Sequence, residues 1–422
     1  MAAESCHPRG LSWFARSCIP ADPARHTAVP VPIPVSAPDA EVPDPETEPP
    51  IAALPDELLL EILARVPRAS LPPLPAVCRR FASLLASQAF LHLRRARGRL
   101  RPCLLAVSSS SRALLLQLHA SPSSCSLDVA ALPLLLPPPL LPHQFAHARA
   151  VAVGRHVYLV GRGATLRVDP LTGAARACAP TLFPRSKFAA AAVGARIYVA
   201  GGSARTAAVE EYDPAADAWR VVAEAPRRRY GCAGAGAGGV FYVAGGVAVG
   251  GRGASAALVE AHACAGSVDA LHVASGAWAW ARPRAVPGGG CVVGACGAGD
   301  GHLYVVASHA VDLSFWRWHG GGGGGSRGSG GGGWVALEAP PVPRGAVGLG
   351  VAVRVAMAGV GADRVAAVVN VAAVRGHAAA AAASGGAVEG LVLVYDIGGG
   401  RWSRAPDLPP GFRRAACAAV EC

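Results

Sequence analysis

Apolar side chains between residues 51 and 97 recur at spacings of three and four, the period of an amphipathic helix. The first stripe starts just after Pro55, a residue that fits the first helical turn, and Pro67 ends it. Its members are Leu58, Leu59, Ile62, Leu63 and Val66. Two further short helices are predicted around Phe81 and Phe90. Three short helices bury only a small core, so we expect an apolar face left over from it to bind a partner.

From about residue 103 the pattern changes to period two and repeats. Strand-like segments ending in small residues recur as VGRHVYLVGRG (153–163), VGARIYVAGGS (193–203), AGGVFYVAGGV (237–247) and GDGHLYVVASH (299–309). A second element follows each strand. In EEYDPAADAW (210–219) and LVYDIGGGRW (393–402) a Trp follows the Asp by the same six-residue offset. Repeats of this size in an all-β chain predict the blades of a β-propeller.

The fold class is therefore mainly β, a β-propeller preceded by a small three-helix module. Six blades are predicted, with five as the alternative because the first lacks the Gly-Gly and Trp marks. They cover about 103–145, 146–182, 185–225, 228–285, 287–339 and 344–408. A last strand, 414–420, is expected to pair into the first blade. Residues 1–50 are predicted to be a disordered Pro-rich tail, 51–97 the helical module and 103–420 the propeller, with Gly/Ala-rich loop insertions near 248–267, 320–333 and 375–388.

Charge and composition narrow the function classes. The net charge is +12, but the excess is almost all arginine, with Lys187 as the single lysine, which a GC-rich coding sequence also explains. The short basic runs lack interleaved aromatics, so nucleic-acid binding is not favoured. No segment reads as a secretory signal or a membrane span, and no CxxC pair occurs, which predicts a cytoplasmic and/or nuclear protein with free thiols. The thirteen histidines show no metal-ligand spacing, and we expect neither a metal nor a cofactor.

Two family resemblances follow from these motifs. Residues 54–93 resemble an F-box through LPDELLLEILARVP and the later Cys-Arg-Arg-Phe, and the repeats resemble kelch repeats through their Gly-Gly, Tyr-Asp and Trp marks. Together the chain resembles a plant F-box/kelch-repeat protein. The resemblance implies a non-catalytic receptor of a Skp–cullin–F-box ubiquitin ligase, with the F-box bound to a Skp-type adaptor and through it to a cullin–RING ligase. The positions that match the adaptor-binding motif are Leu54, Pro55, Leu58, Leu59, Ile62, Leu63, Val77, Cys78 and Phe81. Many F-boxes carry Trp at the place of Phe81.

The propeller would hold the client protein. Arg185, Arg229, Arg344 and Arg413 flank the predicted inner strands, where they form a basic ring for an acidic client, or else are solvated loop residues or buried braces between blades. The repeat aromatics are predicted to be blade core. Two other functions stay open: a kelch scaffold without a ligase role, and a metal-dependent enzyme built on the propeller. The client, any required modification and any small ligand in the channel stay open as well.

Overall fold

The computed structural model describes residues 51–422 except 52, 109, 111, 121–124, 135, 250–263, 281–283, 310–311, 320–332, 344–346, 348–350, 374–387 and 413. The expected tail and most of the three loop insertions lie outside the described residues. The chain divides into two units, residues 1–54 and Pro55–Cys422. The second unit holds the helices and the propeller. No helix of the described residues is long and apolar enough to cross a membrane.

The helical module has three α-helices and two 3-10 turns. They are α1 (Asp56–Arg65), η1 (Arg68–Ser70), η2 (Leu74–Ala76), α2 (Arg79–Ala86) and α3 (Gln88–Ala96). Cys78 and Ser87 are the N-caps of α2 and α3, where a sulfur and a hydroxyl accept backbone N–H groups that the helix leaves unpaired. Arg94 of α3 is buried and donates to the carbonyl oxygens of Ala64 and Val66, so it holds the end of α1 against α3.

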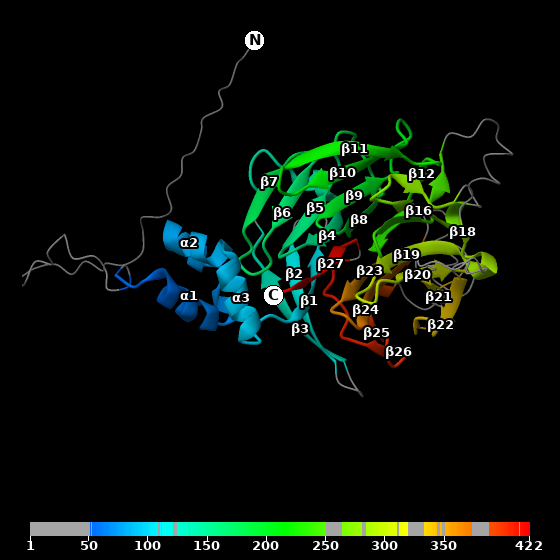
Figure 1. Ribbon diagram of the computed structural model, residues 1–422. Coiled ribbons are helices and arrows are strands. Elements are labelled where there is room, and N and C mark those ends of the chain that lie inside the picture. Colours follow the sequence, from blue (N-terminus) through cyan, green and yellow to red (C-terminus); the bar gives the residue numbers. More distant parts are fainter. Residues whose placement is uncertain are drawn as a thin grey trace, which may run out of the picture. The chain divides into compact units, whose positions relative to one another are not determined.

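Six antiparallel sheets form the propeller (Figure 1). The first contains β27 (Ala416–Glu421), β1 (Pro102–Val107), β2 (Ala113–Ala120) and β3 (Cys125–Leu132). The second contains β4 (Arg149–Val153), β5 (His156–Val160), β6 (Thr165–Val168) and β7 (Ala175–Cys178). The third contains β8 (Ala189–Val193), β9 (Arg196–Ala200), β10 (Ala208–Asp213) and β11 (Ala218–Glu224). The prediction of six blades is confirmed.

In the remaining three sheets, as in the first three, the innermost strand is named first. The fourth contains β13 (Ala233–Ala237), β14 (Val240–Ala244), β16 (Ser267–His272), β17 (Ala277–Trp278) and β18 (Arg284–Ala285), beside a ribbon of β12 (Arg229–Tyr230) and β15 (Val247–Ala248). The fifth contains β19 (Cys291–Gly297), β20 (Leu303–Ser308), β21 (Leu313–His319) and β22 (Gly333–Leu337). The sixth contains β23 (Val351–Val360), β24 (Arg364–Ala373), β25 (Val388–Asp396) and β26 (Arg401–Arg404). Two short 3-10 turns, η3 (Pro142–Phe145) and η4 (Pro287–Gly289), lie between blades.

The last strand closes the ring. β27 pairs antiparallel with β1, with Leu105 opposite Ala418, so one blade is built from both ends of the propeller sequence. This closure was expected from residues 414–420 and is confirmed. Each inner strand (β27, β4, β8, β13, β19 and β23) lies beside the inner strands of its two neighbouring blades. The six inner strands therefore surround a common centre, and no inner sheet edge is left open to pair with another chain.

Small residues on the inner strands allow these strands to pack closely around the centre. A side-chain carbon at Gly236 of β13 would collide with the carbonyl oxygen of Ala192 on β8, and one at Gly297 of β19 would collide with Gly236 in turn. The inner strands approach so closely that only glycine fits at these two places. Much of the glycine and alanine content along the inner strands therefore serves blade packing.

The repeat tryptophans connect neighbouring blades. Trp219 on β11 donates its indole N–H to the carbonyl of Ala179 (2.8 Å), which follows the last strand of the preceding blade. Trp278 donates to Glu224 and Trp402 to Glu338 in the same way, each at 2.7 Å. Trp219 also packs on Tyr212, with ring centroids 5.0 Å apart. The prediction that the repeat aromatics are blade core is confirmed for Trp219, Tyr198 and Tyr242, which are buried.

Candidate functional site

The first helix of the module divides its apolar residues between two sides. Leu59 and Leu63 are 1% and 3% exposed and form the module's core with Leu84, Leu85 and Phe90. Leu58 and Ile62, one residue earlier in each case, are 52% and 48% exposed. Successive residues in a helix are about 100° apart, so pairs at i and i+4 share a side and the two pairs face differently.

A third exposed apolar residue lies just before α2. Val77 precedes the N-cap Cys78 and is 64% exposed, and Cys78 is exposed too. The Arg80 guanidinium lies 2.7 Å from the carboxylate of Asp56, so the start of α2 is held beside the start of α1. We call Leu58, Ile62 and Val77 the apolar face of the module. Exposed apolar side chains on so small a module make this face a candidate surface for a partner.

The other predicted adaptor positions are placed differently. Pro55 is exposed, while Leu54 and Phe81 are half-buried. Phe81 donates its backbone N–H to the Cys78 sulfur (3.4 Å) within the cap of α2. Leu59 and Leu63 are core residues, so they shape the face from beneath and do not offer their side chains to a partner. The motif therefore mixes contact residues with the core residues that hold them in place.

Arg185 and Arg229 correct the client-site prediction. Both are 1% exposed. Arg185 donates to Glu210 (2.7 Å) and to the carbonyls of Gly201 and Ala208, and Arg229 donates to Asp269 (2.7 Å) and to the carbonyls of Gly245 and Cys264. Each arginine thus ties the turn after the second strand of its blade to an acid on the third strand. The expectation that these two side chains face a client is wrong; they are the buried braces weighed as the alternative.

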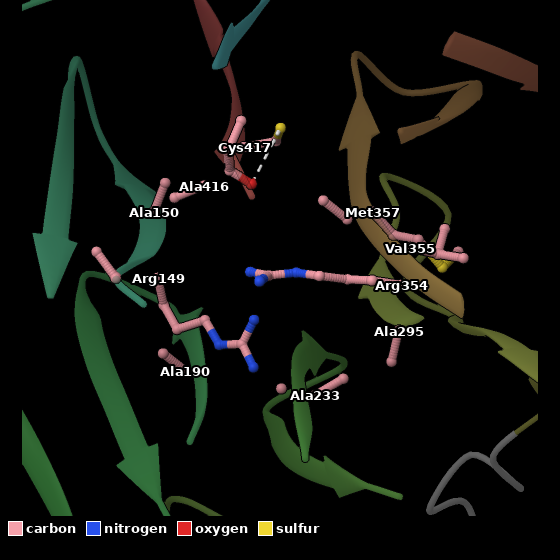
Figure 2. A pocket seen from close by; sticks show the side chains of 14 residues that line it. Arg149, Ala150, Ala190, Ala233, Ala295, Arg354, Val355, Met357, Ala416 and Cys417 are labelled. Carbon is pink, nitrogen blue, oxygen red and sulfur yellow. Dashed lines mark hydrogen bonds between the residues drawn. The ribbon is translucent and has the colours of Figure 1, made fainter. Parts of the chain in front are cut away.

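The remaining two predicted arginines, Arg344 and Arg413, lie outside the described residues. Two other arginines lie around the channel, and they were not predicted from the sequence. Arg149 on β4 and Arg354 on β23 line a cavity between the inner strands, and their guanidinium groups reach toward one another (Figure 2). A signal was present in the sequence, because each is the one charged residue in an otherwise small or apolar inner strand, RAVAV and VAVRVAMAGV.

The described residues also bear on metal binding. Within them, no three His, Cys, Asp or Glu side chains lie together in a group that could hold a metal ion. Burial lowers the pKa of His156, at the start of β5, to about 4, so this side chain is neutral near pH 7.

Comparison with known proteins agrees with this architecture. The F-box domain model matches residues 51–93, and the Kelch motif model matches residues 184–226. F-box/kelch-repeat protein At5g26960 of Arabidopsis thaliana is 43% identical over 99% of this chain and 100% of its own length. The chain belongs to the F-box/kelch-repeat family. F-box/kelch-repeat protein OR23 of the same plant is 28% identical over 41% of this chain and 46% of its own length.

A solved structure, that of YjhT, covers 65% of this F-box/kelch-repeat chain and 87% of its own length, at 17% identity and a TM-score of 0.44. The family assignment rests on the near full-length relative and on the two matched models. It covers both the helical module, which is an F-box, and the propeller, which carries the kelch repeats.

Proposed function

We propose that this F-box/kelch-repeat protein is the substrate receptor of a Skp–cullin–F-box ubiquitin ligase. The F-box binds a Skp-type adaptor and through it a cullin–RING ligase, and the propeller binds the client protein to be ubiquitinated. The observation that carries the proposal is the apolar face, Leu58, Ile62 and Val77, which stays exposed. On α1, the residues that follow Leu58 and Ile62, namely Leu59 and Leu63, are buried. Family membership supports the same assignment.

The mechanism needs no catalytic residue in this chain. The apolar face follows one side of α1 and the start of α2, which suits a hydrophobic groove on the adaptor. Covering three half-exposed aliphatic side chains contributes about 1 kcal/mol each, or about 3 kcal/mol in all, from burial alone. The receptor then acts by holding the client near the charged ubiquitin carrier, which raises its effective concentration there. The proposal includes a cytoplasmic and/or nuclear location, which the scattered, unpaired cysteine pattern of the sequence favours.

The adaptor contact is tested by measuring the affinity of a purified Skp-type adaptor for the full chain and for a Leu58→Glu/Ile62→Glu variant. Both side chains are about half-exposed, so the fold should survive the change. A matched control is Val221→Glu on β11, which replaces an apolar side chain of nearly the same exposure (47%) on the propeller. Leu59→Asp would be a poor probe, because it buries a charge in the module core.

We expect the double variant to bind about 100-fold more weakly or worse, because two central apolar contacts are each worth about 1–2 kcal/mol or more at an interface. The control should bind like the unmodified chain, and circular dichroism should show the same folded content in all three proteins. Equal affinity of the folded double variant would remove the apolar face from the adaptor contact. A folded, unmodified chain that binds no adaptor would reject the receptor role and leave a kelch scaffold.

A further inference from the structure

The channel cavity is small and built from all six blades. Its lining comes from β4, β8, β13, β19, β23 and the residues at the start of β27. The cavity volume is about 70 Å³, far below the roughly 300–1,000 Å³ of sites for drug-sized ligands. A ligand at this place is therefore a group of a few heavy atoms. Most of the lining is alanine, and among the described residues that line it the ionisable side chains are Arg149, Arg354 and Cys417.

One of the two arginines is fixed by the blades. Arg149 donates its Nε–H to the carbonyl of Phe188 (2.7 Å) and an Nη2–H to the carbonyl of Cys232 (2.9 Å). These carbonyls directly precede β8 and β13, so the guanidinium is held in one orientation by two neighbouring blades. Arg354 comes from the other side of the cavity, where its side chain extends toward Arg149 (Figure 2). Within the described part of the chain, no side-chain or backbone oxygen accepts a hydrogen bond from it.

In the part of the chain that the structure describes, no acidic side chain balances the positive charge at this place. None of the described residues that line the cavity carries a carboxylate. Burial, followed by the charge of Arg354, lowers the pKa of Arg149 to about 10, and burial lowers the pKa of Arg354 as well. The Cys417 thiol is no counter-ion, because burial raises its pKa to about 12. Both guanidinium groups still carry a proton at pH 7, so two partly desolvated like charges face one cavity.

Further cations surround the cavity. The pKa of His147, just before β4, is lowered by burial and then by the charges of Lys187, Arg354, Arg414 and Arg149. Lys187 directly precedes Phe188, whose carbonyl Arg149 holds, and Arg414 lies just before Ala415 of the cavity lining. Buried like charges are costly unless an opposite charge or further hydrogen bonds accompany them. An anion in the cavity would supply both.

We propose that the channel binds one small oxyanion, a phosphate, sulfate or carboxylate group, between the guanidinium groups of Arg149 and Arg354. Planar guanidinium groups pair with such groups through two parallel hydrogen bonds, and such charge-assisted bonds are about twice as strong as neutral ones. The group is either a free ion or the end of a side chain that a client inserts into the channel. The site does not depend on the adaptor contact, so each is tested separately.

The test measures the binding of inorganic phosphate to the full chain. Isothermal titration calorimetry gives the affinity, and the shift of the melting temperature with added phosphate gives a second measure. Arg354→Gln removes one guanidinium that no described acceptor holds, so the fold should persist. Arg401→Gln on the outermost strand β26 is the matched control with the same change in net charge. Arg354→Lys keeps the charge but loses the planar fork.

We expect the unmodified chain and Arg401→Gln to bind phosphate equally, Arg354→Gln to bind it about tenfold more weakly or worse, and Arg354→Lys to fall between them. In the absence of phosphate, Arg354→Gln should melt no lower than the unmodified chain, because a repulsive charge is gone. No binding by the unmodified chain, or equal phosphate binding by Arg354→Gln, overturns the proposal. Equal losses in Arg354→Gln and Arg401→Gln overturn it too, because they show a general charge effect.

A second probe identifies the source of the oxyanion. N-acetyl-phosphoserine amide carries the same group on a peptide-like side chain. Displacement of bound phosphate by this probe indicates a group that a client presents, and phosphate binding without displacement indicates a free ion. Either result supports the site, provided that Arg354→Gln abolishes the binding observed.

Discussion

The buried pair of Arg185 and Glu210 provides the sharpest stability test of the blade design. Both side chains are fully buried, with Nε and Oε1 2.7 Å apart. The arginine also donates to the carbonyls of Gly201 (2.8 Å) and Ala208 (2.6 Å), and the second carboxylate oxygen accepts from the backbone N–H of Leu182 (2.6 Å). Arg185→Met keeps most of the side-chain volume but leaves the carboxylate buried without its cation, and leaves two carbonyl oxygens without a donor.

The expected cost follows from this arrangement. Removing one partner of a buried ion pair costs about 3–5 kcal/mol, and the two abandoned carbonyls place this case toward the upper end. Arg185→Met/Glu210→Leu removes the uncompensated charge, so it should recover about 2 kcal/mol or more, because an apolar replacement of a whole pair is often neutral. The single variant should therefore be the less stable of the two.

Urea unfolding followed by tryptophan fluorescence measures the difference, with the midpoint of the first transition compared between variants. Arg220→Met, in the same blade, is the matched control: its side chain is 68% exposed and pairs with Glu211, so it should change stability by less than about 1 kcal/mol. An Arg185→Met midpoint equal to that of Arg220→Met would refute the bracing role. So would a double variant less stable than the single one.

Two further predictions concern packing and pH. Gly236→Ala should destabilise the propeller by about 1–3 kcal/mol, because its new carbon collides with Ala192, whereas Gly333→Ala, with open space around it, should be neutral in the same melting assay. The pKa of His156 is lowered to about 4 in the folded chain. Between about pH 6.5 and pH 4, its imidazole is therefore protonated in the unfolded chain but still neutral in the folded chain. Stability should fall by about 1–2 kcal/mol as pH drops from 6.5 to 4, discounted for partial exposure. His156→Gln should lose that part of the pH dependence, and an unchanged pH profile would contradict the assignment.

The fold followed from the sequence because its signals are repeated. The blades and the core role of Trp219 rest on spacings that recur along the chain, and local patterns that agree with one another specify one structure. The helical stripe was predicted as well. Its division into a buried pair, Leu59 and Leu63, and an exposed pair, Leu58 and Ile62, depends on which side α3 covers, and that is a tertiary contact.

The candidate client site was harder to predict for a physical reason. Arginines that flank inner strands look alike in sequence, whether they are solvated or buried. Arg185 and Arg229 are buried because an acid two strands away, Glu210 or Asp269, compensates each one, and that pairing spans 25 and 40 residues. Arg149 and Arg354 face the channel because inner-strand side chains alternate, and the facing set is fixed only once the ring has closed. Contacts between residues far apart in the sequence therefore determine whether such an arginine is buried within a blade or faces the channel.

The most direct test of the receptor proposal is reconstitution of the full chain with a purified Skp-type adaptor and a cullin–RING scaffold, followed by size-exclusion chromatography. We expect the chain to co-elute with the cullin only when the adaptor is present. Leu58→Glu/Ile62→Glu should abolish co-elution, whereas Val221→Glu should not. A folded chain that stays separate from the cullin with the adaptor present would contradict the receptor proposal, and co-elution of the double variant would show that the apolar face is not the contact.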